Sequence, residues 1–157
     1  MRIGILTLSD TRTQADDESG QAVRGLVEQL PGAEVVVYDV VADNQACIQA
    51  ELIRFVDDMK CQVVLTTGGT GLGPRDVTPE ATMAVCDRLV PGIPEAMRAQ
   101  TFAKTPMAML SRAVAGLRGE SLIINLPGSP KGARECAEVV LPVLGHAVKV
   151  AAGGPVH

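Results

Sequence analysis

The residues best suited to chemistry lie together in one stretch, Thr66 to Glu80, which has the sequence TTGGTGLGPRDVTPE. Glycines let the backbone come close to a ligand, and their N–H groups can point at phosphate oxygens. Arg75 and Asp76 supply charge of both signs beside them. A phosphate or other anion site is therefore expected here, with a plain glycine-rich turn as the alternative. The loop residues expected to bind the ligand are Gly68, Gly69, Thr70 and Gly71.

This loop matches neither of the two commonest phosphate-binding motifs. A Walker A loop ends in Gly-Lys-Ser or Gly-Lys-Thr, whereas Gly73 is followed by Pro74. A dinucleotide-binding fingerprint needs the spacing G-x-G-x-x-G, and the third glycine here comes one position too early. The ligand site is therefore expected to have another architecture.

Two aspartates are the candidate catalytic carboxylates. Asp76 can hold a magnesium ion on phosphates or orient a reacting group. Its alternative role is to cap the next helix or to pair with Arg75. Asp43 follows a predicted strand and can face the same cleft, but it can equally be the N-cap of a helix that begins at Asn44.

Two further polar loops are expected beside the glycine loop. Ser9 and Asp10 follow the first predicted strand. The turn from Pro127 to Lys131 follows the last strand and offers the Ser129 hydroxyl, free helix N–H groups and a cation, which suit an anion. The alternative is a helix cap with a solvated lysine. Ligands of parallel α/β sheets bind at the carboxyl ends of the strands, so these loops predict a single cleft.

The chain must fold so that these loops meet. Apolar runs rich in Val and Ile predict strands, and each is followed by a helical pattern. The alternation predicts one three-layer α/β domain over residues 1–157, with a mostly parallel sheet flanked by helices on both faces. Pro142 is expected to kink or divide the last helix, and residues 111–116 look flexible in composition. The predicted strands are 2–8, 34–41, 62–66 and 121–125, and the predicted helices include 43–59, 78–88, 94–102 and a last one from Pro130.

Composition narrows the possible functions. The net charge is −4, aromatic residues make up 2% of the chain and Trp is absent, which disfavours nucleic-acid binding. No apolar run approaches the length of a membrane span, and the N-terminus is interpreted as a strand, so a cytoplasmic protein is expected. The cysteines lack metal-site spacing and are expected to be buried or half-buried thiols. They are Cys47, Cys61, Cys86 and Cys136.

These motifs together resemble a known family. The chain is similar to the MogA/MoaB family of molybdenum cofactor biosynthesis, and most of all to its MogA-type adenylyltransferases. The resemblance covers nearly the whole chain and is specific in the combination of its motifs. These are Thr67 to Gly71, Arg75 to Ala81, Leu110 to Arg112 and Asn125 to Lys131, with the Leu8 to Asp10 and Asp43 segments also in agreement.

The resemblance implies an activity, a site and an assembly. It implies transfer of AMP from ATP to the phosphate of molybdopterin, with release of pyrophosphate, by a protein that is commonly a homotrimer. Asp43 and Asp76 match the aspartates assigned to catalysis in the family. Because two anions must react, Mg²⁺ is an implied cofactor, with the same aspartates as its holders. The remaining expected contacts to nucleotide or molybdopterin are Ser9, Asp10, Ser111, Arg112, Pro127, Gly128, Ser129 and Lys131.

Other functions stay open from the sequence. A MoaB-like protein can bind or scaffold molybdopterin without adenylyl transfer, although the intact segment around Asp76 favours an active enzyme. A related module occurs in CinA-like nucleotide-processing proteins, which the length of this chain disfavours. In the enzyme hypothesis the product is expected to pass to a metal-insertion protein.

Overall fold

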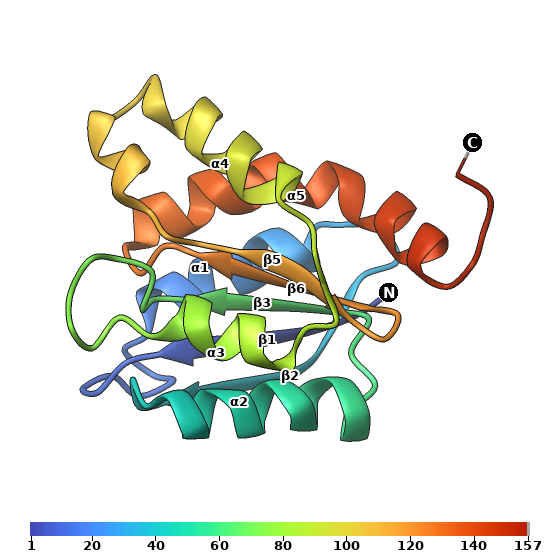
Figure 1. Cartoon of the computed structure of the whole chain (residues 1–157), viewed down its shortest axis with the longest axis horizontal. Coiled ribbons are helices and arrows are strands. Elements are labelled where there is room, and N and C mark those ends of the chain that lie inside the picture. Colours follow the sequence, from blue (N-terminus) through green and yellow to red (C-terminus); the bar gives the residue numbers. More distant parts are fainter. Residues whose placement is uncertain (157) are drawn as a thin grey trace.

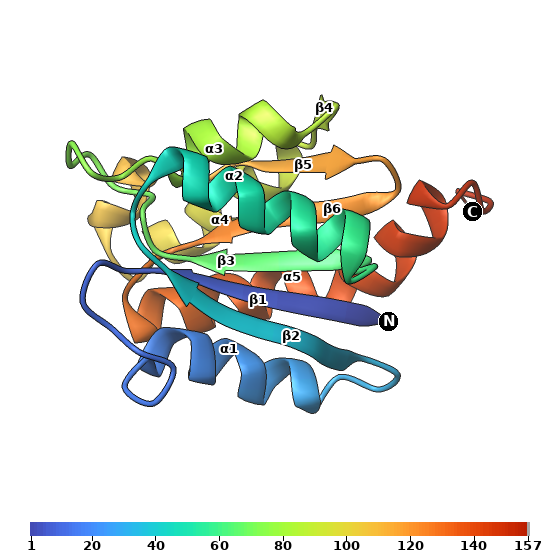
Figure 2. The same cartoon turned by 90° about the horizontal axis from the view of Figure 1, so that it is seen from below.

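The sheet of this protein has six strands in the order β2-β1-β3-β6-β5-β4. The computed structural model describes residues 1–156. Strands β2, β1, β3 and β6 run parallel, β5 is antiparallel to β6, and β4 is antiparallel to β5 (Figure 2). The strands are β1 Arg2–Leu8, β2 Glu34–Val41, β3 Val63–Thr67, β4 Arg88–Leu89, β5 Ala115–Arg118 and β6 Ser121–Leu126.

Helices cover both faces of this sheet (Figure 1). One layer holds α1 Glu18–Glu28, α4 Gly92–Phe102 and α5 Pro130–Ala151. The other holds α2 Gln45–Ile53 and α3 Thr78–Val85. A π-helical turn, η1 Arg54–Asp58, continues α2, and a 3₁₀ turn, η2 Pro106–Leu110, follows α4. The predicted three-layer α/β fold is therefore confirmed.

The core forms two halves because successive strand residues point to opposite faces of the sheet. Ile3 and Ile5 of β1 pack with α1, α4 and α5, whereas Leu6 and Leu8 pack with α2 and α3. Every residue of β3 is buried. Strands buried on both faces in this way are typical of parallel sheets.

Several boundaries differ from the predictions. Strand β3 begins at Val63, one residue later than expected, and α4 begins at Gly92 rather than at Pro94. The short strands β4 and β5 were not predicted, and β5 begins inside the segment that looked flexible. They are too short, at two and four residues, to show a clear apolar pattern.

Pro142 does not divide α5, which runs for 22 residues through it. The proline removes one N–H from the helix ladder and frees the carbonyl of Glu138. Both residues are exposed, so water can satisfy that carbonyl. Among residues 1–156, no helix combines the length and apolar character that crossing a membrane requires.

Candidate functional site

The parallel strands β1, β2, β3 and β6 end at one edge of the sheet, and their loops gather there, at the left of Figure 1. Backbone hydrogen bonds tie the loops together. The Ser9 N–H donates to the carbonyl of Val41 at 2.9 Å, and the Gly68 N–H donates to that of Leu126 at 3.1 Å. The expectation that these loops share one edge is confirmed.

The first two glycines of the loop adopt a backbone conformation that other residues disfavour. The φ angles of Gly68 and Gly69 are +95° and +68°. A Cβ on Gly68 would lie 2.6 Å from the carbonyl oxygen of Leu8, and one on Gly69 would lie 2.1 Å from Oγ1 of Thr78. The Thr78 hydroxyl in turn donates to the Gly68 carbonyl at 3.0 Å. The loop is therefore held in one shape by its own packing.

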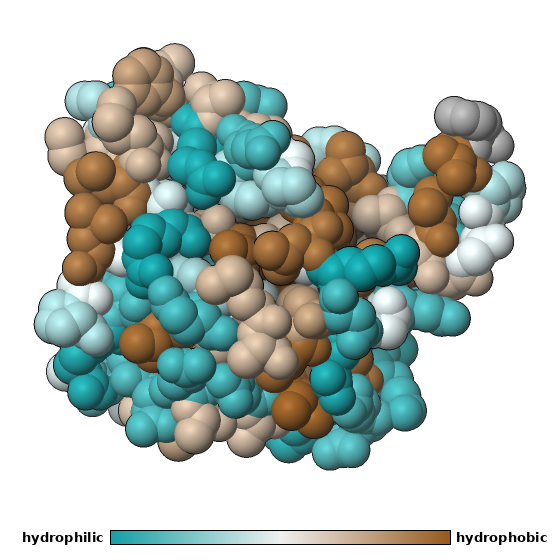
Figure 3. Space-filling model, in the orientation of Figure 1, coloured by the Kyte–Doolittle hydropathy of each residue, from teal (hydrophilic) through white to brown (hydrophobic). Residues whose placement is uncertain are grey.

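A cleft of about 620 Å³ opens beside this loop. Its walls are the glycine loop, the turn after β6, the start of α5 and the η2 region. Figure 3 shows hydrophobic side chains gathered at the end of the molecule where α4 and η2 lie. The expected residues that line the cleft are Gly69, Thr70, Gly71, Asp76, Ser111, Pro127, Gly128 and Ser129.

The other expected residues lie around the cleft rather than in its walls. Asp10 pairs with Arg75 through two hydrogen bonds, of 2.6 and 2.9 Å, and accepts another from the Asp43 N–H at 3.0 Å. The Ser9 hydroxyl oxygen accepts backbone N–H groups of its own loop. Gly68 lies against the backbone at the end of β1, where a Cβ would meet the Leu8 carbonyl oxygen.

The two candidate catalytic carboxylates are close enough to interact electrostatically. Burial raises the pKa of Asp43, and the neighbouring charges of Asp10 and Asp76 raise it further. Oδ1 of Asp43 lies 3.2 Å from the position of a Cβ built on Gly69, so the carboxylate faces the glycine loop. A crowded, partly buried carboxylate of this kind is typical of functional sites.

The alternative roles of these aspartates are not observed. The side chain that caps α2 is Asn44, which accepts from the Cys47 N–H at 3.0 Å, so Asp43 is not the N-cap. Asp76 neither caps α3 nor pairs with Arg75. Instead its Oδ2 accepts the Gly73 N–H at 2.9 Å. Among residues 1–156, no hydrogen-bond donor reaches its Oδ1.

Arg112 holds the glycine loop in place. Its guanidinium donates to the carbonyl of Gly71 at 2.8 Å and to that of Asp76 at 2.6 Å, and it pairs with Glu80. Its own N–H donates to the carbonyl of Thr70 at 2.8 Å. Arg112 thus holds the backbone of the glycine loop from Thr70 to Asp76 and is not among the residues that line the cleft.

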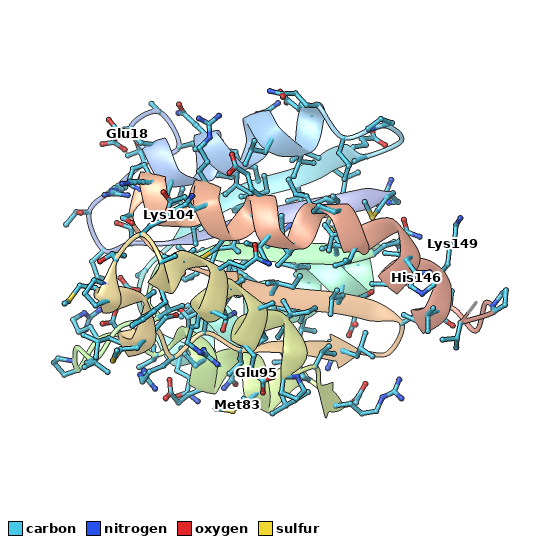
Figure 4. All side chains as sticks on the ribbon, turned by 90° about the horizontal axis from the view of Figure 1, so that it is seen from above. Glu18, Met83, Glu95, Lys104, His146 and Lys149 are labelled. Carbon is cyan, nitrogen blue, oxygen red and sulfur yellow. The ribbon has the colours of Figure 1, made fainter. Side chains whose placement is uncertain are left out.

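Lys131 is exposed, and its neighbour Glu135 is a site residue that the sequence did not reveal. The Lys131 side chain is 82% exposed, with Nζ 4.0 Å from Oε1 of Glu135. Glu135 lines the cleft and is only 13% exposed. Lys104, at the end of α4, lies over the first half of α5 (Figure 4), with its Nζ 3.5 Å from the same oxygen. In the sequence, the i,i+4 spacing of Lys131 and Glu135 is typical of an ordinary ion pair on a helix surface, so it gives no sign of a cleft residue.

A buried network joins α1 to the turn after β6. Asp17 is fully buried and accepts hydrogen bonds from the hydroxyls of Thr7 and Tyr38, the first at 2.6 Å. It also caps α1 by accepting the Gly20 N–H. Two residues later, the Ser19 hydroxyl donates to the Gly128 carbonyl at 2.5 Å. The start of α1 therefore fixes one wall of the cleft, a role that its acidic sequence did not show.

Among the described residues, no three His, Cys, Asp or Glu side chains are placed to hold a metal ion together. Burial raises the pKa of Cys136, which lines the cleft, to about 11, so its thiol is neutral at pH 7. Cys61 is buried and Cys86 half-buried, as predicted, but the prediction was wrong for Cys47, which is exposed on α2.

The chain is similar in sequence to characterised families. The family model described as "Probable molybdopterin binding domain" matches residues 4–146. A Helicobacter pylori protein named molybdopterin adenylyltransferase is 43% identical over 156 residues, covering 98% of this chain and 89% of that protein. The Escherichia coli protein of the same name is 41% identical over 152 residues, covering 94% of this chain and 77% of that protein.

Solved structures show the same fold. The molybdopterin biosynthesis enzyme MoaB from Thermus thermophilus superposes with a TM-score of 0.89 at 49% identity, covering 99% of each chain. The molybdopterin biosynthesis Mog protein from Mycobacterium ulcerans superposes with a TM-score of 0.87 at 38% identity, covering 97% of each chain. The fold, the motifs and these relatives agree, and the chain belongs to the MogA/MoaB family of molybdopterin-binding domains.

Proposed function

We propose that this protein is a molybdopterin adenylyltransferase, which joins the AMP part of ATP to the phosphate of molybdopterin and releases pyrophosphate. The observation that carries the proposal is the placement of Asp43 and Asp76 beside one glycine loop, where Asp76 also lines the cleft. The names of relatives at 41–43% identity support the same activity.

The chain offers several groups for the anionic parts of both substrates. Gly69, Thr70, Gly71 and Ser111 line the cleft. Ser129 lies at the N-terminus of α5, where the helix dipole favours negative charge. Holding two phosphates in reach of each other lowers the barrier by removing the entropic cost of their encounter. Arg112 and Ser19 position the loops that do so.

The two aspartates fit a magnesium ion. Burial raises the pKa of Asp43, and the nearby carboxylates of Asp10 and Asp76 raise it further; a bound cation would relieve this repulsion between like charges. Mg²⁺ commonly takes only one or two carboxylates from the protein and completes its shell with water and substrate phosphates. We propose that Asp43 and Asp76 hold it. When bound, Mg²⁺ would neutralise phosphate charge during the transfer of AMP from ATP to the molybdopterin phosphate.

A second function within the family is molybdopterin binding without transfer. It is considered because the chain is 49% identical to a molybdopterin biosynthesis enzyme named MoaB, a name that specifies no reaction. Release of pyrophosphate from ATP in the presence of molybdopterin separates the two. We expect release by the wild type and little by Asp76→Asn. Equally low release by both would reject the enzyme and favour the binding protein.

We also propose that the protein acts in the cytoplasm as a homotrimer and passes its product to a metal-insertion protein, as the family resemblance implies. Large apolar side chains of η2 are available for such contacts, since Met107 is 63% and Met109 60% exposed. Sedimentation equilibrium tests the assembly. A mass three times that of the chain is expected, and a monomer would contradict the trimer.

A further inference from the structure

Glu135 is an unexpected residue in a cleft that is proposed to bind two anions. Its side chain lies on the first turns of α5, is 13% exposed and faces the cleft. Among residues 1–156 it accepts no hydrogen bond, and its nearest cations, Lys104 and Lys131, lie at 3.5 and 4.0 Å. A carboxylate there repels phosphate, so its presence requires another explanation.

A role as counter-ion for Lys104 and Lys131 is a poor explanation for the presence of Glu135 in the cleft. The Lys131 side chain is 82% exposed and that of Lys104 is 52% exposed, so water solvates both ammonium groups. Ion pairs in which the ammonium partner stays well solvated contribute little to stability. By contrast, a partly desolvated carboxylate that lacks hydrogen bonds is strongly favourable for a ligand that brings its own N–H donors.

The neighbourhood of Glu135 suits a flat heterocycle. The same cleft is lined by the apolar side chains of Met107, Ala108 and Leu110, and by Cys136, whose thiol is neutral. These groups lie on η2 and α5, whereas the backbone that we propose to bind phosphate lies on the glycine loop, which forms another wall of the cleft. Cofactor sites are commonly apolar with a few polar groups that fix orientation. Glu135 is the charged group of this apolar part.

We infer that Glu135 recognises the pterin ring of molybdopterin by accepting hydrogen bonds from its N3–H and 2-amino groups. This inference rests on the proposed function. The two donors are adjacent on one edge of the ring and match the two oxygens of a carboxylate. Adenine presents only its 6-amino group on the corresponding edge, beside a ring nitrogen that is an acceptor and repels the second oxygen. Glu135 therefore selects the pterin and leaves the adenine to another part of the cleft.

A pair of uncharged ring probes tests this inference without turnover. Binding of 6-hydroxymethylpterin and of the matching lumazine, in which an oxygen replaces the 2-amino group, is measured by fluorescence titration. For the wild type we expect the pterin to bind at least about tenfold more tightly than the lumazine, because one charge-assisted hydrogen bond is replaced by a repulsion. Glu135→Gln is expected to reduce this preference to within about twofold.

Two further variants distinguish a role of Glu135 in recognising the ring from a role in the folded structure. Glu138→Gln changes an exposed glutamate one turn along the same helix, which pairs with Arg134 at 3.8 Å, and is expected to keep the wild-type preference. Glu135→Asp keeps the charge but shortens the side chain, so an intermediate preference is expected. Equal loss of pterin and lumazine affinity in Glu135→Gln would assign Glu135 a structural role and overturn the inference.

Titration with ATP and Mg²⁺ distinguishes the two heterocycles. Glu135→Gln is expected to bind ATP as tightly as the wild type or slightly more tightly, because a repelling charge has gone. Weaker ATP binding with an unchanged pterin preference would place adenine at Glu135 and overturn the inference. A wild type that prefers the pterin but produces no pyrophosphate would instead reject the proposed transferase activity, while recognition of the ring by Glu135 would stand.

Discussion

At the scale of single residues, the neighbours of a carboxylate in space indicate its role better than its position along the chain does. Asp43 and Asp76 could be proposed from the sequence because each follows a strand of the parallel sheet, and ligands commonly bind at the carboxyl ends of such strands. Arg112 is also identifiable, but not its orientation, because its partners Gly71 and Glu80 come from another loop and helix. Glu135 has no such signal, since only the fold turns its face of α5 into the cleft.

Asp43→Asn removes a carboxylate that burial and two like charges disfavour. We therefore expect the folded protein to keep or slightly increase its melting temperature. Turnover is expected to fall by about 100-fold or more, the usual effect of removing one electrostatic group from a reacting centre. Thermal unfolding and pyrophosphate release are measured on the same sample. A variant with lower stability and normal turnover would make Asp43 a structural residue.

Glu80 gives the fold a defined dependence on pH. Its hydrogen bond from Arg112 holds its pKa below the ordinary value of 4.5. The folded-state pKa is the lower one, so Glu80 stabilises the fold above pH 4.5 and loses that contribution as the pH falls through the folded value. Because the side chain is 40% exposed, the effect is at most about 1 kcal/mol.

Glu80→Gln tests this dependence by urea unfolding at a series of pH values. The variant is expected to be less stable than the wild type at pH 7 and to approach it as the pH falls below the pKa window of Glu80. A constant difference across the series would show that the Arg112 contact does not depend on the charge of Glu80.

At the scale of elements, the sequence predicts the strands and helices whose apolar pattern extends over many residues. Strands β1, β2 and β6 and the helices between them were expected because their apolar residues repeat over many positions. Strand β5 was missed because it spans four residues, including Gly116. That glycine permits close approach of β4, since a Cβ there would lie 2.8 Å from the Arg88 carbonyl. Pairing in space, rather than local preference, makes this segment a strand.

Gly69→Ala is expected to distort the turn between β3 and α3. A Cβ at this φ of +68° is strained and would lie 2.1 Å from Oγ1 of Thr78. The expected cost is about 1–3 kcal/mol of stability, with impaired ligand binding because the loop must shift. Gly25→Ala is the control, since nothing lies within 4 Å of its new Cβ in α1. That helical change is expected to stabilise the protein by about 0.5–1 kcal/mol. Urea unfolding measures the free energy of unfolding of the two variants. Equal changes in Gly69→Ala and Gly25→Ala would contradict the proposed strain at Gly69.

At the scale of the whole molecule, the fold brings distant segments together in one cleft. It also leaves most of the cysteine thiols buried or half-buried. Burial raises the pKa of Cys61, Cys86 and Cys136 to about 11. Only Cys47 is exposed. We expect one equivalent of thiol to react rapidly with a thiol reagent at pH 7 and four after denaturation, with Cys47→Ser abolishing the rapid phase. A rapid phase that persists in Cys47→Ser would show that the core opens readily.

In the proposed reaction, AMP passes from ATP to molybdopterin at the site formed by Asp43, Asp76 and the glycine loop. The most direct test follows label from ATP marked at its α-phosphate after mixing with molybdopterin and Mg²⁺, with Asp76→Asn as the comparison. Label is expected to enter molybdopterin in a 1:1 ratio with released pyrophosphate, and to be nearly absent with the variant or after chelation of the metal. If the wild type binds molybdopterin yet transfers no label, the proposed activity is contradicted.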